Sequence, residues 1–232
     1  MKRGITKNKL VVASEYSERS NPIKFNKIAT SHSVNASRNS RIGFTLAEVL
    51  ITLGVIGVVA AMTLPKLVQN YQKYKTVNQL KKSYTILNQA FKMSEIDNDT
   101  YENWTLIGDE FTTKEFAEKY FKPYLKVIKT CNNPISCYNG TNPLRASAFG
   151  LVLNDGSYVW FRTKNSVPLV TVDINGIVRP NIYGRDMFFF DLGNKGIYTK
   201  FVDGTYCNEI DRDGCVGKII HDGWKISDDY PW

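Results

Sequence analysis

A run of 21 residues, from Phe44 to Leu64, is almost entirely apolar and carries one charge, Glu48. As a helix, such a run spans the roughly 30 Å hydrocarbon core of a lipid bilayer. A carboxylate inside that core costs at least about 2.5–3.5 kcal/mol, so it requires a partner. Any fold of this chain must therefore place the run in lipid or in an apolar assembly, and must account for Glu48.

The segment before the run, residues 1–43, is strongly basic. It holds nine Lys and Arg residues and two Glu residues, a net charge of +7, whereas the other 189 residues carry a net charge of only +1. The basic excess therefore belongs to this leader and not to a folded nucleic-acid-binding surface. The leader is rich in Ser and Asn and has no regular apolar period, which predicts disorder. Its charge places it on the cytoplasmic side of the membrane.

Three interpretations of the apolar run compete. A secretory signal peptide cut near Ala61 would have a shorter apolar region without a carboxylate. An ordinary transmembrane anchor would leave Glu48 unpaired. A cut between Gly43 and Phe44 would instead create an α-amine with a pKa of about 7.7–8.0, which is largely protonated at neutral pH. Glu48 would neutralise that amine within one helix or between staggered neighbouring helices, where a paired charge is penalised much less than an unpaired one.

The string Arg41-Ile42-Gly43-Phe44-Thr45-Leu46-Ala47-Glu48, with the apolar run and Pro65 after it, resembles the N-terminal signature of type IV pilins and type II secretion pseudopilins. The resemblance implies that a membrane-embedded prepilin peptidase cuts after Gly43 and methylates Phe44. It also implies that Glu48 is the assembly carboxylate and that Pro65 kinks the helix. The leader of 43 residues departs from the short leaders of many major pilins.

The same resemblance implies a structural subunit of a type II secretion or type IV pilus-like filament. Its partners would be the prepilin peptidase, other pilin or pseudopilin subunits, an inner-membrane assembly platform and the lipid bilayer. The chain would cross the bacterial inner membrane once, with its leader in the cytoplasm and its head in the periplasm. The near-neutral charge after residue 43 predicts no nucleic-acid partner. The alternatives are a minor pilin with an adhesive or DNA-binding head, and a membrane-anchored enzyme.

Beyond Pro65 the sequence becomes amphipathic. Apolar residues recur at steps of three and four from Leu67 to Phe91, and Lys, Gln and Asn lie between them. This pattern predicts one long helix over residues 44–95, in which Pro65 weakens the backbone ladder. Residues 44–64 would be the transmembrane and assembly part, and residues 65–96 a stem packed against a globular head.

The head, residues 97–232, is predicted to combine short helices with an antiparallel sheet. A turn-rich stretch over 97–111 precedes Thr112-x-x-Glu115, a capping box for a helix ending near Lys122. From Phe149 the apolar period becomes two, and the pairs Asp155-Gly156 and Asn175-Gly176 predict hairpin turns. We expect four to five strands laid across the long helix, which is an α+β fold.

The four cysteines all follow the apolar run, which favours disulfides in an oxidising compartment. Four cysteines allow three pairings, and proximity alone favours the two short loops. A zinc site would require tighter pairs or histidine partners. The cysteines are Cys131, Cys137, Cys207 and Cys215.

Cofactors and catalysis have little support in the sequence. Asp173, Asn175 and Asp186 offer oxygen ligands for calcium, but they lack the spacing of an EF-hand, and turn formation is the simpler interpretation. We therefore expect no metal and no cofactor, with calcium as the alternative. The chain has only two histidines, one of them in the leader, and no catalytic motif stands out. An enzyme is not expected.

Overall fold

A computed structural model of the chain describes residues 43–105, 112–144, 147–164 and 167–232. The predicted leader lies outside the described residues except for Gly43, and so does part of the predicted loop over 97–111. The chain divides after Val49 into two units, Met1–Val49 and Leu50–Trp232.

The longest element is α1, Leu46–Asn98, a single α-helix that continues through Pro65. The sequence predicted a helix over 44–95, and the ends differ by two or three residues, as is usual for frayed helix termini. Packing against the head begins at Thr76, about three turns later than the amphipathic stripe suggests. In the stripe, Val77, Leu80, Leu87 and Phe91 are buried, whereas Leu67, Tyr71 and Tyr74 are exposed.

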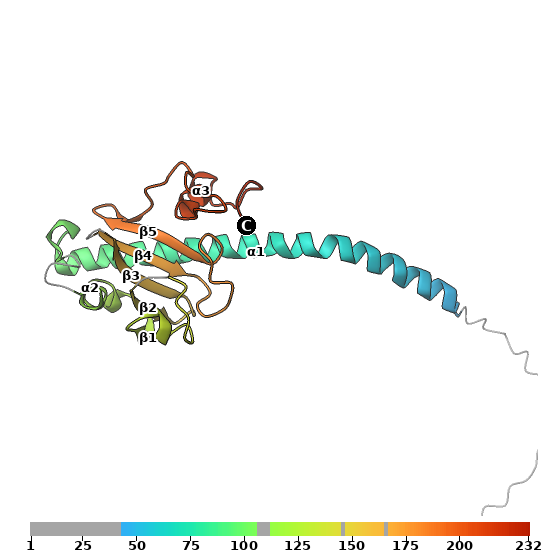
Figure 1. The fold of residues 1–232 in the computed structure, drawn as a ribbon, viewed down its shortest axis with the longest axis horizontal. Coiled ribbons are helices and arrows are strands. Elements are labelled where there is room, and N and C mark those ends of the chain that lie inside the picture. Colours follow the sequence, from blue (N-terminus) through green and yellow to red (C-terminus); the bar gives the residue numbers. More distant parts are fainter. Residues whose placement is uncertain (1–42, 106–111, 145–146, 165–166) are drawn as a thin grey trace, which may run out of the picture. The chain divides into compact units, whose positions relative to one another are not determined.

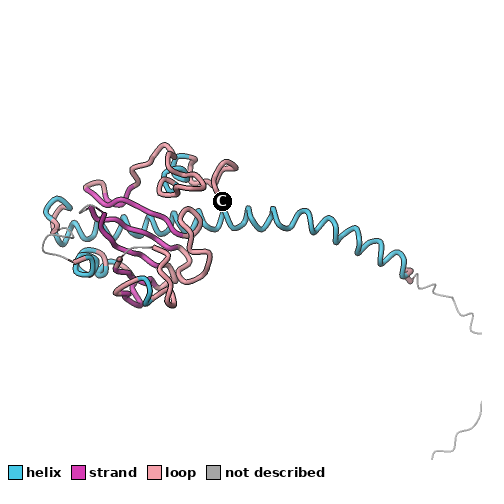
Figure 2. The backbone as a smooth tube through the Cα atoms, viewed as in Figure 1, coloured by secondary structure: helices cyan, strands magenta, loops and turns pink. Residues whose placement is uncertain are grey.

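The head contains a six-stranded antiparallel sheet whose strands follow one another in chain order. Figure 1 shows the C-terminal half of α1 running along this sheet, and Figure 2 shows the strands in magenta. The predicted α+β class is confirmed, with six strands in place of four to five. The strands are β1 (Val127–Cys131), β2 (Phe149–Leu153), β3 (Tyr158–Lys164), β4 (Val167–Asp173), β5 (Met187–Gly193) and β6 (Gly196–Tyr198).

One of the two predicted hairpins is confirmed and the other is wrong. Gly156 has a φ of +87° in the turn between β2 and β3, where Asp155-Gly156 predicted it. Gly176 also has a positive φ, +65°, but Ile177 and Val178 after it are exposed and form no strand. The chain instead makes a longer loop, and β4 pairs with β5.

Strand β1 was not predicted because it is an edge strand with only one buried residue. Its sequence lacks the clear alternation that marks a half-buried strand, and its conformation depends on pairing with β2. At the other edge, Asn88 of α1 completes β6: its Oδ1 accepts from Ile197 N at 3.1 Å, and its Nδ2 donates to Ile197 O at 3.3 Å. The side-chain amide of Asn88 thus makes the two hydrogen bonds that a neighbouring strand would make with Ile197.

The short helices surround the sheet. Helix α2, Thr113–Tyr120, begins with the predicted capping box between Thr112 and Glu115, and η2, Lys122–Tyr124, follows it. Helix α3, Cys215–His221, was not predicted. Two further 3-10 turns are η1, Tyr101–Asn103, and η3, Pro134–Ser136.

Both faces of the sheet are buried. One face packs against α1, α2 and α3 and forms the main core, in which Phe91, Phe116, Phe161 and Phe190 are fully buried. On the opposite face, Trp160 lies at the centre of a smaller core that also contains Cys131, Cys137, Tyr138, Leu144, Val152 and Met187. Because both faces are buried, the sequences of the central strands are almost continuously apolar and do not strictly alternate between apolar and polar residues.

Candidate functional site

The first candidate site is the start of α1, where Thr45 and Glu48 form a reciprocal cap. Glu48 Oε2 accepts hydrogen bonds from Thr45 N at 2.8 Å and Thr45 Oγ1 at 2.9 Å, and Glu48 N donates to Thr45 Oγ1 at 3.2 Å. This is a capping box, in which each residue satisfies the backbone amide of the other. The signal Thr-x-x-Glu was present in the sequence but was not recognised there. The Glu48 carboxylate thus has a local partner, Thr45, that the sequence analysis did not predict.

The bond between Gly43 and Phe44 precedes this cap and is accessible. Helix α1 begins at Leu46, so both residues lie in non-helical backbone. The Phe44 side chain is 85% exposed, and a Cβ atom placed on Gly43 would contact nothing within 4 Å. Exposed backbone outside regular secondary structure is where proteases cut chains most readily.

The apolar part of α1 in the second unit exposes its large side chains. Nine large apolar side chains between Leu50 and Leu64 are each more than half exposed. Burying one such side chain is worth about 1.5–3 kcal/mol, so leaving nine in water forgoes on the order of 10 kcal/mol or more. Among the described residues, α1 is the one helix whose length and composition fit a membrane span. The helix therefore fits an anchor in a membrane.

Both disulfides lie in the head and close short loops. Cys131 and Cys137, with Cα atoms 6.0 Å apart, join the end of β1 to the turn after η3. Cys207 and Cys215, with Cα atoms 4.5 Å apart, fix the start of α3. These are the two pairings that proximity favoured, and they fit an oxidising compartment.

Asp173, one of the three candidate calcium ligands, is fully buried at the end of β4 and is bonded by neighbouring groups. Its Oδ2 accepts from the Tyr138 hydroxyl at 2.6 Å, and its Oδ1 accepts from Gly176 N at 2.8 Å. Trp160 Nε1 donates to the Tyr138 hydroxyl oxygen at 3.0 Å, which extends the network across the sheet face. Sequence reasoning missed the Tyr138–Asp173 pair because 35 residues separate its members.

Asp186, the second candidate ligand, closes the loop between β4 and β5. It accepts from Ile182 N at 2.6 Å, Asn181 N at 2.8 Å and Asn175 Nδ2 at 3.3 Å. The structure thus brings Asp173, Asn175 and Asp186 into one loop, where both carboxylates hold backbone amides. Within the described residues, no group of three or more His, Cys, Asp or Glu side chains is arranged to hold a metal ion. These contacts fit the interpretation that the residues form turns.

Comparison with known proteins gives two family matches. Residues 38–64 match the prokaryotic N-terminal methylation motif, the signature of type IV pilins and pseudopilins. Residues 66–200 match a family described as a family of unknown function, DUF6613. No curated protein and no solved structure matches the chain. The methylation motif ends just before Pro65 and covers the predicted cleavage site and the apolar half of α1.

Proposed function

Since the chain belongs to DUF6613, a family of unknown function, and carries the methylation motif of pilin-like proteins, we propose that it is a structural subunit of a pilin-like filament. A prepilin peptidase cuts it between Gly43 and Phe44, and the new N-terminus is methylated. The observation that carries this proposal is the coincidence of the motif with a helix whose apolar side chains are exposed and whose length and composition fit a membrane span. Such a helix gains its stability from lipid before assembly and from neighbouring subunits after it.

The proposed cut changes what Glu48 does. In the uncut chain the carboxylate caps α1 through Thr45. After the cut, a protonated amine at Phe44 lies next to the helix N-terminus, where the helix dipole disfavours positive charge. The nearby Glu48 carboxylate offsets that charge within one chain or from a neighbouring subunit. The carboxylate is thus a helix cap in the precursor and an ion-pair partner in the mature subunit.

The proposed location is the bacterial inner membrane. The basic leader stays in the cytoplasm by the positive-inside rule, and the head lies on the opposite side. Two disulfides in the head fit that oxidising side. Assembly would require other pilin or pseudopilin subunits and an inner-membrane platform, in a secretion or pilus system.

The first test is intact-mass analysis of the full-length chain, expressed with and without a prepilin peptidase. With the peptidase, we expect a chain that begins at methylated Phe44. Replacement of Gly43 by Leu should leave the leader attached, because the bulky side chain occupies the position before the cut. A mature chain cut near Ala61, or one that keeps residues 1–43 in the presence of the peptidase, would contradict the proposal.

The second test separates the two roles of Glu48. Glu48→Val should be cut normally but fail to enter filaments in a reconstituted assembly assay. Thr45→Ala is the matched control, because it removes the two hydrogen bonds of the cap that use Thr45 Oγ1 while keeping the carboxylate, and it should be cut and assembled. Normal assembly of Glu48→Val would refute the assigned role of the carboxylate and leave the cleavage proposal intact.

A further inference from the structure

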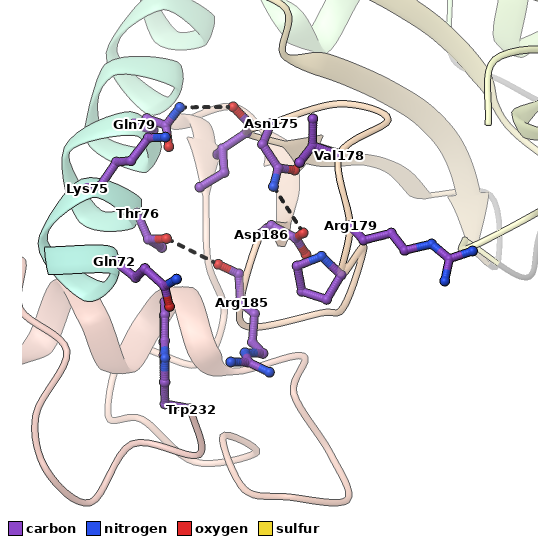
Figure 3. Close-up of a pocket in the computed structure, with 12 residues that line it drawn as sticks. Gln72, Lys75, Thr76, Gln79, Asn175, Val178, Arg179, Arg185, Asp186 and Trp232 are labelled. Carbon is purple, nitrogen blue, oxygen red and sulfur yellow. Dashed lines mark hydrogen bonds between the residues drawn. The ribbon is translucent and has the colours of Figure 1, made fainter. Parts of the chain in front are cut away.

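A cavity of about 570 Å³ opens on the head where three distant segments meet. One wall is the stretch of α1 from Gln72 to Gln79, the second is the loop between β4 and β5, and the third is Trp232. Figure 3 shows side chains from all three segments around it. Its volume lies within the roughly 300–1,000 Å³ that small organic ligands occupy.

The lining contains charged side chains of both signs. Lys75, Arg179 and Arg185 line the cavity, and among the described residues none of the three has a carboxylate within 4.0 Å. Asp186 is the one acid in the lining, and its oxygens are bonded to amides of its own loop. Lys75 and Arg185 can therefore pair with a bound anion, whereas the oxygens of Asp186 already accept hydrogen bonds.

Arg185 is held in place more firmly than a surface arginine. Its guanidinium lies 5.3 Å from the ring centre of Trp232, a cation–π distance, and its backbone carbonyl accepts from Thr76 Oγ1 at 3.5 Å. Figure 3 shows Arg185 beside Trp232, whereas Arg179 extends away from the other lining residues. Arg185 thus presents a planar set of donors that suits a carboxylate or a phosphate.

Side-chain amides provide the neutral part of the lining. Gln72, Gln79 and Asn175 face the cavity, and Gln79 Nε2 donates to Ile174 O at 3.4 Å. Amides of this kind donate to and accept from hydroxyl groups.

We propose that this cavity binds a small organic anion in which a carboxylate or phosphate group is attached to a hydroxyl-bearing body, such as an acidic sugar. The oxyanion lies against Arg185 and Lys75. Its hydroxyl groups contact the side-chain amides of Gln72 and Gln79. This binding site is separate from the cleavage site, so it is tested without processing or assembly.

The test is isothermal titration calorimetry of the uncut full-length protein in a neutral detergent, with three probes of similar size. Glucuronate supplies the carboxylate, glucose 6-phosphate supplies the phosphate, and glucose carries neither. We expect saturable binding of at least one anion and none of glucose. The anion that binds more tightly identifies the oxyanion source. Failure of both anions, or equal binding of glucose, would overturn the proposal.

Variants locate the binding in the cavity. Arg185→Gln should weaken the anion about tenfold or more, because it removes charge-assisted hydrogen bonds. Lys75→Gln changes an exposed side chain of α1 and should weaken binding without affecting the fold. The matched control is Lys195→Gln, which removes an exposed lysine from the turn between β5 and β6 and should bind as the wild type does. Unchanged affinity in both cavity variants would place the anion elsewhere and refute the assignment.

Discussion

Replacing Asp173 with Asn should change how the stability of the head depends on pH. Burial raises the pKa of this carboxyl from 3.8 to about 7, although the hydrogen bond from Tyr138 acts to lower it, and the nearby Asp186 raises it further. Folding therefore favours the protonated form. The stability that this group contributes is fully present below pH 3.8 and is lost as the pH rises through about 7.

The magnitude follows from the size of the shift. One pKa unit corresponds to about 1.4 kcal/mol, so a rise from 3.8 to about 7 corresponds to roughly 4 kcal/mol between acidic and mildly alkaline pH. Asn at position 173 keeps an oxygen that accepts from Gly176 N, but it does not titrate. The free energy of unfolding of Asp173→Asn, relative to that of the wild type, should therefore increase by roughly 4 kcal/mol from pH 4 to pH 8.

The assay is denaturant unfolding of the full-length protein in neutral detergent at several pH values between 4 and 8. Tryptophan fluorescence reports on the site, because Trp160 is hydrogen-bonded to Tyr138. Asp155→Asn is the control. Burial acts to raise the pKa of Asp155, but hydrogen bonds from Lys82 and Ser157 outweigh it, so this carboxyl stabilises the head less as the pH falls. Parallel pH profiles for the wild type and Asp173→Asn would refute the reasoning.

Three further predictions concern the stability of the head. Leu87→Ala removes a fully buried side chain from the main core and should lower the free energy of unfolding by about 2–5 kcal/mol, measured by denaturant titration. Asn88→Ala leaves the backbone groups of Ile197 unpaired at the edge of the sheet and should cost about 1–3 kcal/mol, with faster amide exchange at Ile197; unchanged exchange would contradict it. Replacing Cys207 and Cys215 together by Ala opens one disulfide loop and should lower the free energy of unfolding by about 2–3 kcal/mol. The melting temperature of this variant under oxidising conditions should be lower than that of the wild type, and an unchanged melting temperature would contradict the prediction.

Much of the local structure was predictable because its causes lie within a few residues. The capping box of α2 depends on Thr112 and Glu115, three positions apart, and the turn between β2 and β3 depends on Asp155-Gly156. The same rule applies to Thr45 and Glu48, which also lie three positions apart and form a cap. Short-range hydrogen bonds of this kind form wherever the sequence supplies both partners.

The wrong predictions involve partners that are distant in the sequence. Asn175-Gly176 was expected to close a hairpin, but Asp186 accepts a hydrogen bond from Asn175 Nδ2, 11 residues earlier, and the next strand begins only at Met187. Strand β1 is defined by pairing with β2, about 20 residues later. The stem helix packs on the head only from Thr76, because that is where the sheet and its loops reach α1.

The sequence by itself determined the N-terminal part of this protein: a basic segment, a prokaryotic N-terminal methylation motif and an apolar helix with one carboxylate. Charge, length and apolar content are properties of a contiguous segment, so no fold is needed to read them. Only the tertiary structure decided what the head offers, because Lys75, Arg185 and Trp232 come together through packing of α1, a loop and the C-terminal segment. The same holds for Asp173, whose raised pKa results from burial that no local pattern encodes.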